Sequence, residues 1–320
     1  MSAQTSEVEQ QPRDVIFRNY SAQQASNYAE GRLGYSEKLI EFITSQHKST
    51  GGKDEIVLDV GCGPGPATRL LAPRFDVAYG ADPGESMIKK AQEIGGTSAN
   101  GNPIMYTLSS AEEVDKIDGL GNSSVDLITA ATAAHWFDMT KFWKAAAKLL
   151  KPGGTVAIWT AFRQSDTSGG NEIQAIIDDF RENVLGPYNS AGTQLTEDGY
   201  VDLIMPWDDS TTALLYDRQS SSRHELSVKD GYFPSTYLLH TEAHDIPLDE
   251  KLHKFEKLIN SFGSVNRWQE ANPELVGTED DIVKVLMRKI RKAAENNGGS
   301  LDFSSLAGKF AIAVIIVKKS

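Results

Sequence analysis

Five short apolar runs separated by helical stretches constrain the fold of this chain more than any other feature of its sequence. The runs are EIVLDV (55–60), VAYGAD (77–82), PIMYTL (103–108), VDLITAA (125–131) and TVAIWTA (155–161). Helices are expected between them at 66–72, 84–94, around 111–116 and 139–150. Strands that alternate with helix-length connections favour a parallel sheet with helices on both faces. Near-continuous apolar strands fit such a doubly covered sheet.

The segments before this alternating region have a different character. Residues 1–13 are polar and acidic, which predicts a disordered tail. Residues 14–50 predict a helical segment, with Ser36 as the N-cap of its second helix. We therefore expect the core to occupy residues 51–162, where KPGG (151–154) ends a helix and turns into the last strand of the alternating series.

After Phe162 the alternation stops. Residues 163–231 are rich in Asp, Ser, Gly and aromatic side chains and are too long for an ordinary connection, so they predict a substrate-binding insert. Residues 232–320 are expected to complete the core sheet and to add helices to the substrate pocket. The expected elements are a strand near 232–241, helices at 248–262 and 278–296, and a final strand at 309–318.

Charge and cysteine content argue against several classes of function. The 320 residues carry a net charge of −12, and the densest basic run, 284–292, follows an acidic stretch, so no nucleic-acid partner is expected. The longest apolar run, FAIAVIIV (310–317), is too short to span a bilayer, and MSAQTSEVEQQPRD (1–14) lacks a secretory or transit pattern. The single cysteine fits a reducing compartment and excludes a cysteine-based zinc site. We expect a cytoplasmic protein with no metal site and no membrane partner.

The segment VLDVGCGPGPATRLL (57–71) places Gly61, Gly63 and Gly65 between the first strand and the next helix. Glycines there permit positive φ angles and a close approach of ligand to backbone, and the helix N-terminus, with Pro66 in its first turn, presents free N–H groups. A P-loop needs a Lys-Ser/Thr pair after its last glycine, and PATRL follows instead. A dinucleotide turn needs Gly or Ala where Pro66 stands. The turn is therefore typical of neither phosphate-binding motif.

Three segments, in order, resemble the class I S-adenosylmethionine-dependent methyltransferases: VLDVGCGPG (57–65), GADPGESMI (80–88) and LLKPGGTVAIW (149–159). The resemblance implies an α/β fold with a doubly wound, Rossmann-like, seven-stranded and mostly parallel sheet. It also implies a C-terminal antiparallel strand and a mainly helical insert or cap. The cofactor that it implies is S-adenosyl-L-methionine, whose sulfonium and ammonium groups, with no phosphate, suit an acidic chain without a basic residue in the turn.

The same resemblance implies a set of cofactor contacts. Gly61, Gly63 and Gly65 would face the methionine part of the cofactor. Asp59 would orient its ammonium group, directly or through the turn, and Asp82, at the end of the second strand, would bind the ribose hydroxyls. The remaining candidates are Met87 beside the adenine (unless it is only a core residue), Ser110, Ala111 and Glu112 after the third strand, and Ala131 at the end of the fourth.

The methyl acceptor is expected to meet the cofactor at ATAAHWFD (131–138), which follows the fourth strand. Methyl transfer is an in-line displacement that mainly needs alignment and the exclusion of water. His135 is the candidate catalytic residue, as a general base or as a hydrogen-bond partner of the acceptor; alternatively, it and Trp136 only wall the cofactor pocket. A base is needed only where the acceptor must lose a proton, so a carboxylate acceptor needs none.

Over its whole length the chain is similar to the fungal trans-aconitate methyltransferase-like proteins, on NYAEGRLGYSEKL (27–39), AAHWFD (133–138), LGPY (185–188) and SFGSVNRWQEANPE (261–274). In that group the N-terminal segment folds over the cofactor, so Tyr20, Tyr28 and Arg32 are candidates for closing the site; the tyrosines would otherwise pack between helices. The substrate-binding candidates are Trp136, Tyr188, Trp207, Arg267 and Trp268. SVNRW (264–268) departs from the aromatic, Thr-rich segment of the aconitate enzymes, which leaves the acceptor open.

The sequence thus predicts methyl transfer from S-adenosylmethionine to a small-molecule carboxylate or hydroxyl group. An alternative is a catalytically inactive, cofactor-binding relative with a regulatory or interaction role, against which the glycine turn, Asp82 and AHWFD argue. A nicotinamide dehydrogenase is a third possibility. Cys62 is expected to be a small residue of the turn rather than a nucleophile, because no histidine lies near it in sequence.

Overall fold

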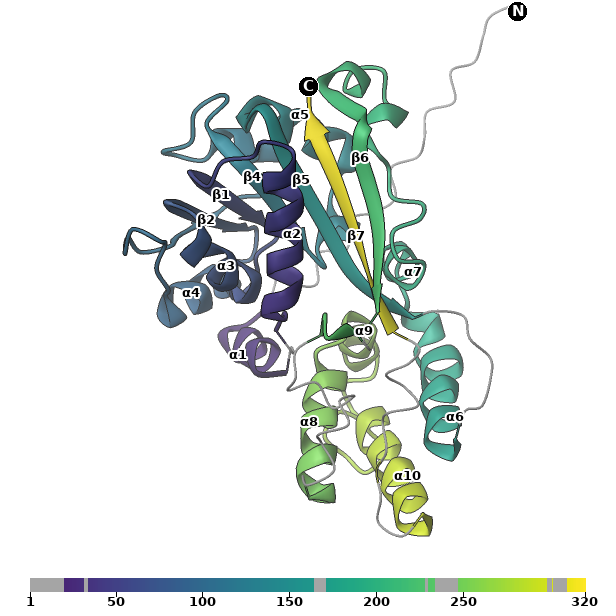
Figure 1. The fold of residues 1–320 in the computed structure, drawn as a ribbon. Coiled ribbons are helices and arrows are strands. Elements are labelled where there is room, and N and C mark those ends of the chain that lie inside the picture. Colours follow the sequence, from purple (N-terminus) through teal and green to yellow (C-terminus); the bar gives the residue numbers. More distant parts are fainter. Residues whose placement is uncertain are drawn as a thin grey trace, which may run out of the picture.

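One mixed sheet organises the molecule. The computed structural model describes residues 20–31, 34–163, 171–227, 230–233, 247–297, 301 and 310–320. In these residues the sheet has seven strands: β1 (Ile56–Val60), β2 (Val77–Asp82), β3 (Met105–Leu108), β4 (Val125–Ala131), β5 (Leu150–Arg163), β6 (Tyr216–Ser227) and β7 (Phe310–Lys319). Their order is β3-β2-β1-β4-β5-β7-β6, with β1 to β5 parallel and β7 antiparallel to both neighbours (Figure 1). This confirms the predicted fold class.

Helices cover both faces of the sheet and one of its edges. They are α1 (Ala22–Gly31), α2 (Glu37–Ser49), α3 (Pro66–Leu71), α4 (Glu85–Ile94), α5 (Met139–Leu149), α6 (Glu172–Asp179), α7 (Ala191–Glu197), α8 (Leu248–Asn260), α9 (Gly263–Ala271) and α10 (Ile282–Asn296). Ser36 accepts a hydrogen bond from the backbone N–H of Leu39 and so caps α2, as predicted. Asp138 caps α5 in the same way. In most of the alternating region, the starts of helices and strands therefore lie where local sequence patterns such as N-cap residues predict them.

Alternate residues of each strand enter two separate apolar cores. Val57 and Ala157 belong to the core that α2, α6, α8 and α10 share, whereas the next residues along, Leu58 and Ile158, belong to the core beneath α5. Successive side chains of a strand point to opposite faces, so a strand covered on both sides is apolar throughout. This explains the continuous apolar runs of the sequence.

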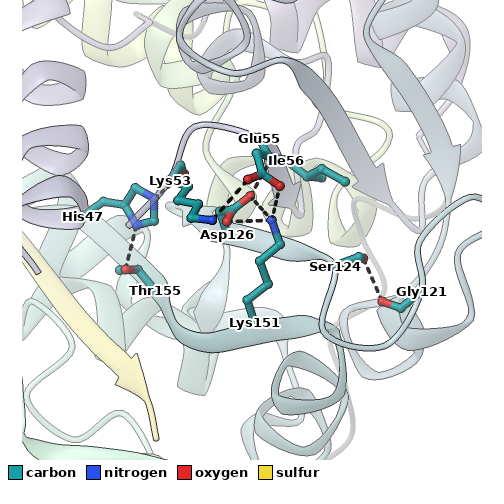
Figure 2. Close-up of polar contacts among 9 residues, drawn as sticks. All are labelled: His47, Lys53, Glu55, Ile56, Gly121, Ser124, Asp126, Lys151 and Thr155. Atoms are coloured by element: carbon teal, nitrogen blue, oxygen red, sulfur yellow. Dashed lines mark hydrogen bonds and ion pairs between the residues drawn. The ribbon is translucent and has the colours of Figure 1, made fainter. Parts of the chain in front are cut away.

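Ion pairs and hydrogen bonds tie the amino ends of three strands together (Figure 2). Asp126, which is 3% exposed, accepts from the backbone N–H of Ile56 at 2.9 Å, and Lys151 Nζ lies 2.9 Å from both of its oxygens. Lys151 also donates to Glu55 at 2.6 Å, which lowers the pKa of that carboxyl. These bonds join the starts of β1, β4 and β5.

A buried histidine extends this structural edge. His47 Nε2 lies 2.8 Å from the carbonyl oxygen of Lys53, so it carries the proton, and Nδ1 accepts from the Thr155 hydroxyl at 2.8 Å (Figure 2). Thr155 in turn accepts from Lys318 Nζ at 2.7 Å. Burial lowers the pKa of His47, which keeps the ring neutral. The polar groups of the amino edge are therefore engaged in holding the fold.

A helical layer stands beyond the opposite, carboxyl edge of the parallel strands. In Figure 1, α6, α8 and α10 lie below the carboxyl end of β5, and α1 lies below β1 and β2. The α1 helix contacts both α4 and α8, while α10 contacts α6 and α8. Ligands of doubly wound folds bind outside the carboxyl ends of the strands, so this layer closes over the place where a ligand is expected.

Three elements differ from the sequence predictions. The sixth strand, β6, lies at Tyr216–Ser227 and not near 232–241; residues 232 and 233 are not in a strand, and 234–241 lie outside the described residues. β5 begins at Leu150 and runs through the predicted KPGG turn. The insert contains α6 and α7, whose positions the sequence had not specified. The predicted tail, 1–13, lies outside the described residues.

Candidate functional site

A cavity of about 420 Å³ opens at the carboxyl edge of the sheet, between the strand ends and the helical layer. This volume falls within the range of about 300–1,000 Å³ that is usual for small-molecule sites. The predicted site residues that line it are Tyr28, Gly61, Gly63, Asp82, Met87, Ala111, Glu112, Ala131, His135, Trp136 and Arg267. The cavity therefore joins the predicted cofactor residues to two of the predicted acceptor residues.

The glycine turn has left-handed backbone at all three glycines, with φ of 67° at Gly61, 53° at Gly63 and 81° at Gly65. The backbone N–H groups of Gly61 and Cys62 both donate to the carbonyl oxygen of Ala81, at 2.7 and 3.0 Å. These bonds fix the turn above the end of β2. Residues with a Cβ rarely adopt such φ angles, which explains the alternate glycines.

The three glycines differ in what a Cβ at each position would meet. A Cβ on Gly61 would lie 2.6 Å from Ala133 Cβ, and a Cβ on Gly65 would lie 2.5 Å from the Tyr106 hydroxyl. By contrast, the nearest atom to a Cβ on Gly63 would be Tyr28 Cε1 at 4.0 Å, so the open space beside Gly63 belongs to the cavity. Gly65 does not line the cavity; its position is explained by packing against Tyr106 and by capping α3.

Asp82 is held in place by the glycine turn. Its Oδ2 accepts from the backbone N–H of Gly63 at 2.9 Å, and its Oδ1 accepts from the backbone N–H of Gly84 at 2.8 Å. A carboxylate has about four acceptor positions, so both oxygens can also accept from a ligand. Two rigid backbone bonds therefore aim a carboxylate into the cavity at the end of β2.

Asp59 lies behind the turn and not in the cavity. It is fully buried, and its two oxygens accept from the hydroxyls of Thr68, at 2.6 Å, and Thr129, at 2.7 Å. Burial raises the pKa of Asp59 to about 6, against the opposing effect of these two hydrogen bonds. Of the two routes expected for Asp59, this position leaves only the indirect one, through the turn. Burial likewise raises the pKa of the Cys62 thiol, which disfavours a nucleophilic thiolate.

Apolar side chains line the cavity next to Asp82. Met87 is 2% exposed and packs with Tyr20 and Tyr28 of the N-terminal segment, whose rings meet edge to face. Tyr28 lines the cavity, whereas Tyr20 lies outside its lining and its hydroxyl accepts from Asn266 Nδ2 at 2.7 Å. The N-terminal segment thus reaches both the cofactor end of the cavity and α9. Arg32 lies outside the described residues.

The segment after β3 contributes Ala111 and Glu112 to the cavity lining, but not Ser110. Ser110 precedes the 3₁₀ turn Ala111–Lys116 as its N-cap residue. Glu112 Oε1 accepts from the backbone N–H of Asp138 at 2.8 Å, which links this turn to the segment after β4.

His135 lies at the other side of the cavity, in the 3₁₀ turn Ala134–Trp136 that follows β4. Its Nδ1 lies 2.7 Å from the hydroxyl of Tyr200, a residue that is 1% exposed and has a φ of 65°. Gly192, in α7, approaches the same histidine so closely that a Cβ there would lie 3.0 Å from the His135 carbonyl oxygen. Tyr200 and Gly192, both in the predicted insert, therefore hold His135 in place.

Among the described residues, three arginines line the cavity, and each is held by hydrogen bonds or an ion pair. Arg163 forms a two-pronged pair with Asp178, and Arg181 donates to Glu197 at 2.9 Å. Arg267, in α9, donates from Nε to the carbonyl oxygen of Tyr188 and from Nη2 to the Thr193 hydroxyl at 3.4 Å. Tyr188 itself does not line the cavity; its backbone positions Arg267.

The remaining predicted acceptor residues lie elsewhere. Trp207 packs against the core beneath α5, with the guanidinium of Arg218 5.3 Å from its ring centre. Trp268 is 6% exposed in α9 and is outside the cavity lining. Neither ring lines the cavity, because Trp207 packs against the core beneath α5 and Trp268 is buried in α9.

Several lining residues were not identified from the sequence. They include Tyr35, Thr132, Trp159, Arg163, Arg181, Phe255 and Ile259. Thr132 adopts a φ of 51°, a strained conformation for a branched residue and one that is often found at functional sites. Trp159 and Arg163 could have been found, since they lie near the carboxyl end of the fifth strand. The residues of α6 and α8 carry only the apolar periodicity of ordinary helices.

The described residues contain no group of three or more His, Cys, Asp or Glu side chains that could hold a metal ion. Within the same residues, no helix has the length and apolar character needed to cross a membrane.

The cavity fits S-adenosylmethionine. Asp82 offers carboxylate oxygens suited to ribose hydroxyls, Met87 and Ala111 offer an apolar slot beside it, and the backbone at Gly63 is open to close approach. Among the described residues, the lining of the cavity contains no lysine, and a phosphate-free cofactor is consistent with that lining.

Comparisons with known proteins agree with this geometry. Residues 58–158 match the family described as "Methyltransferase domain". The chain is 28% identical over 227 residues to a protein described as a methyltransferase from Dictyostelium discoideum, covering 70% of this chain and 79% of that one. It is 22% identical over 275 residues to a protein described as an S-adenosylmethionine-dependent methyltransferase from Saccharomyces cerevisiae, covering 84% and 87%.

A solved structure shows the same fold. A protein from Anaeromyxobacter dehalogenans that is described as a type II methyltransferase superposes with a TM-score of 0.53 at 20% identity, over 90% of this chain and 97% of that one. The domain match begins inside β1 and ends in β5, so it spans the strands whose carboxyl ends form the cofactor side of the cavity. Residues 58–158 thus form a methyltransferase domain, and together with the relatives this match makes the chain an S-adenosylmethionine-dependent methyltransferase.

Proposed function

We propose that the enzyme methylates the carboxylate of a small molecule held between His135, Arg267 and the cofactor. The observation that carries this proposal is that one cavity contains Asp82 and Gly63 as well as His135 and Arg267. When bound, the cofactor supplies a sulfonium-linked methyl group, whose C–S bond breaks with its electron pair left on sulfur as the acceptor oxygen bonds to carbon. A carboxylate reacts as its anion, so no proton has to be removed.

The cofactor residues have separate tasks in this proposal. Asp82 accepts hydrogen bonds from the ribose hydroxyls, while Gly61 and Gly63 allow the methionine part to lie against the turn. Met87, Ala111 and Tyr28 cover the adenine side and exclude water. Asp59 stabilises the turn by joining Thr68 of α3 to Thr129 of β4.

Arg267 supplies the positive charge for the acceptor. An arginine fork matches the two oxygens of a carboxylate. The bonds from Arg267 to Tyr188 and Thr193 fix the direction of the guanidinium, and both partners belong to the segment between α6 and the end of α7. These insert residues thereby position the acceptor group through Arg267.

The hydrogen bonding of Tyr200 defines the role of His135. Burial raises the pKa of Tyr200 well above its ordinary value, against hydrogen bonding from Thr160 and from the backbone at His135 and Ala134. Burial keeps the Tyr200 phenol protonated, and in our proposal this phenol donates its proton to His135 Nδ1, 2.7 Å away. The neutral ring then carries its proton on Nε2. His135 therefore acts as a hydrogen-bond donor to the acceptor oxygen, not as a base.

Trp159 supplies a second donor in the same region. Its side chain lines the cavity and is 1% exposed, and its indole N–H has no hydrogen-bond partner among the described residues. A buried donor without a partner costs about 1–3 kcal/mol. An acceptor oxygen would satisfy this N–H, which supports an oxygen acid as the acceptor.

The pH dependence of turnover tests the role of His135. We expect the rate of methyl ester formation from a carboxylic acid, at saturating S-adenosylmethionine, to stay level from about pH 8 to about pH 5, because both protonation states of the imidazole keep Nε2–H. A rate that falls steadily as the imidazole gains its second proton would show that His135 acts as a base and that the acceptor is a hydroxyl group.

Three variants distinguish a positioning role of Tyr200 and His135 from a role in folding. Tyr200→Phe removes the hydrogen bond to Nδ1, so the His135 ring can adopt either tautomer. We expect kcat to fall about tenfold and the Kd for S-adenosylhomocysteine to stay unchanged. His135→Gln, which keeps an N–H donor, should retain more activity than His135→Leu. Equal loss in the Gln and Leu variants would contradict a donor role.

A further inference from the structure

We infer that the acceptor is an elongated molecule with an apolar body and a single acidic group, and not a polycarboxylate. This inference rests on the proposed function and deepens it. It follows from the end of the cavity that lies away from Asp82, where α6, α8 and the first residues of β7 converge. Six side chains there form what we call the apolar wall: Ile177, Phe180, Phe255, Ile259, Phe310 and Ile312.

The apolar wall is a prepared surface and not the exposed flank of one helix. Phe255 and Ile259 lie one turn apart on α8 and are 7% and 3% exposed. Ile177 and Phe180 come from α6 and the turn that follows it, and Ile312 comes from β7. Three elements that are far apart in the sequence thus direct apolar side chains into the same cavity that holds the cofactor and acceptor residues.

The charges around the cavity limit the charge of its occupant. Arg163, whose register partner in the sheet is Phe310, is engaged by Asp178, and Arg181, next to Phe180, is engaged by Glu197. Within the described part of the lining, the carboxylates are Asp82, Glu112 and Glu197, and the arginines are Arg163, Arg181 and Arg267. A molecule with several carboxylates would place some of them against apolar side chains or against these acids. Burying a charge without a partner is unfavourable, whereas one carboxylate at Arg267 leaves the rest of the molecule free to be apolar.

Binding of straight-chain acids to the full-length protein with S-adenosylhomocysteine present tests this inference without requiring turnover. Saturated monocarboxylates of increasing length, kept below their micelle concentrations, are titrated by calorimetry next to dicarboxylates of the same length. We expect the Kd of the monocarboxylates to fall about fourfold for each added methylene until the cavity is filled. The matched dicarboxylates should bind at least about 100-fold more weakly, because their second charge meets the apolar wall. Tighter binding of short polycarboxylates would overturn the inference.

Substitutions on α8 show whether the acids occupy this cavity. Ile259→Trp should fill the cavity and shift the preferred chain to a shorter one, and Ile259→Ala should shift it to a longer one. Leu252→Ala is the matched control, because Leu252 is 4% exposed on the same helix but does not line the cavity. Its length preference should equal that of the wild type. Equal shifts in both alanine variants, or binding that Ile259→Trp does not alter, would show that the acids bind elsewhere and would overturn the inference.

The products separate this inference from the proposed function. Acids that follow the expected length dependence but are not methylated would contradict carboxylate methylation while leaving the apolar occupant supported. Methyl esters formed only from polycarboxylates would support the proposed function and overturn the inference. Methyl esters of the tightly bound monocarboxylates would support both.

Discussion

Replacing Asp82 by Asn gives the sharpest prediction for the cofactor end of the cavity. The carboxylate accepts from two backbone N–H groups, of Gly63 and Gly84, and is expected to accept from two ribose hydroxyls as well. Asn keeps the shape but exchanges one acceptor oxygen for an N–H₂ group. A hydrogen bond to a charged group contributes about 1.5–3 kcal/mol, so losing one such bond and weakening another is expected to cost about 2–4 kcal/mol. That is roughly a 30- to 1,000-fold rise in the Kd for S-adenosylhomocysteine.

Isothermal titration with S-adenosylhomocysteine measures this change directly. Asp126→Asn is the matched control, because Asp126 also accepts a backbone N–H at a strand end, but at the opposite edge of the sheet (Figure 2). It should lower the melting temperature and leave the Kd unchanged, since it breaks the pairing with Lys151 far from the cavity. An Asp82→Asn protein that binds S-adenosylhomocysteine as tightly as the wild type would refute the assignment of Asp82.

Three further predictions concern the turn and the acceptor. Gly63→Ala should raise the Kd for S-adenosylhomocysteine more than Gly61→Ala does, because the new Cβ at residue 63 would enter the cavity. Gly61→Ala should lower the melting temperature more than Gly63→Ala does, because its Cβ would meet Ala133. Calorimetry and thermal shift on both variants measure the two effects. The pKa of Asp59 is raised from 3.8 to about 6, so the folded state binds more protons between these values and stability should fall by about 3 kcal/mol as pH rises through that window. Urea unfolding at several pH values should show this slope in the wild type and a flatter one in Asp59→Asn; equal slopes would show that Asp59 is not its source. Arg267→Ala should raise the KM for a carboxylic acid at least about tenfold and leave the Kd for S-adenosylhomocysteine unchanged; a variant that does not fold would instead make Arg267 structural.

The central strands could be predicted because their signals are local. β2 and β4 lie where the apolar runs VAYGAD and VDLITAA place them, since a doubly covered strand must be apolar at every position. β6 could not be predicted in the same way. Its sequence, YDRQSSSRHELS, is polar because it is an edge strand, paired only with β7 and largely open to solvent. Its register is set by β7, almost a hundred residues later.

The residues of the candidate site show the same difference between local signals and tertiary packing. Gly63 lies three residues after the end of β1 and Asp82 ends β2, so their place at the carboxyl edge follows from the sequence alone. Trp207 and Trp268 lie outside the cavity lining, and the sequence gives no sign of this because the type of an aromatic residue does not reveal which face of its element is buried. The apolar wall could not be foreseen, since Phe180, Phe255 and Ile312 meet only after three distant elements have packed together. Tyr200 could not be predicted for the same reason, because it lies 65 residues after His135 in the sequence and meets it only in the folded chain.

The most direct test of the account follows the methyl group itself. The full-length protein is incubated with S-adenosylmethionine carrying a deuterated methyl group and with the monocarboxylate that binds most tightly, and the products are separated by mass spectrometry. The account predicts a methyl ester that retains all the deuterium of the transferred group, formed together with an equal amount of S-adenosylhomocysteine, and greatly reduced in the Arg267→Ala protein. Tight binding of both ligands with no labelled ester, or label found on a nitrogen or carbon atom of the acceptor, would contradict it.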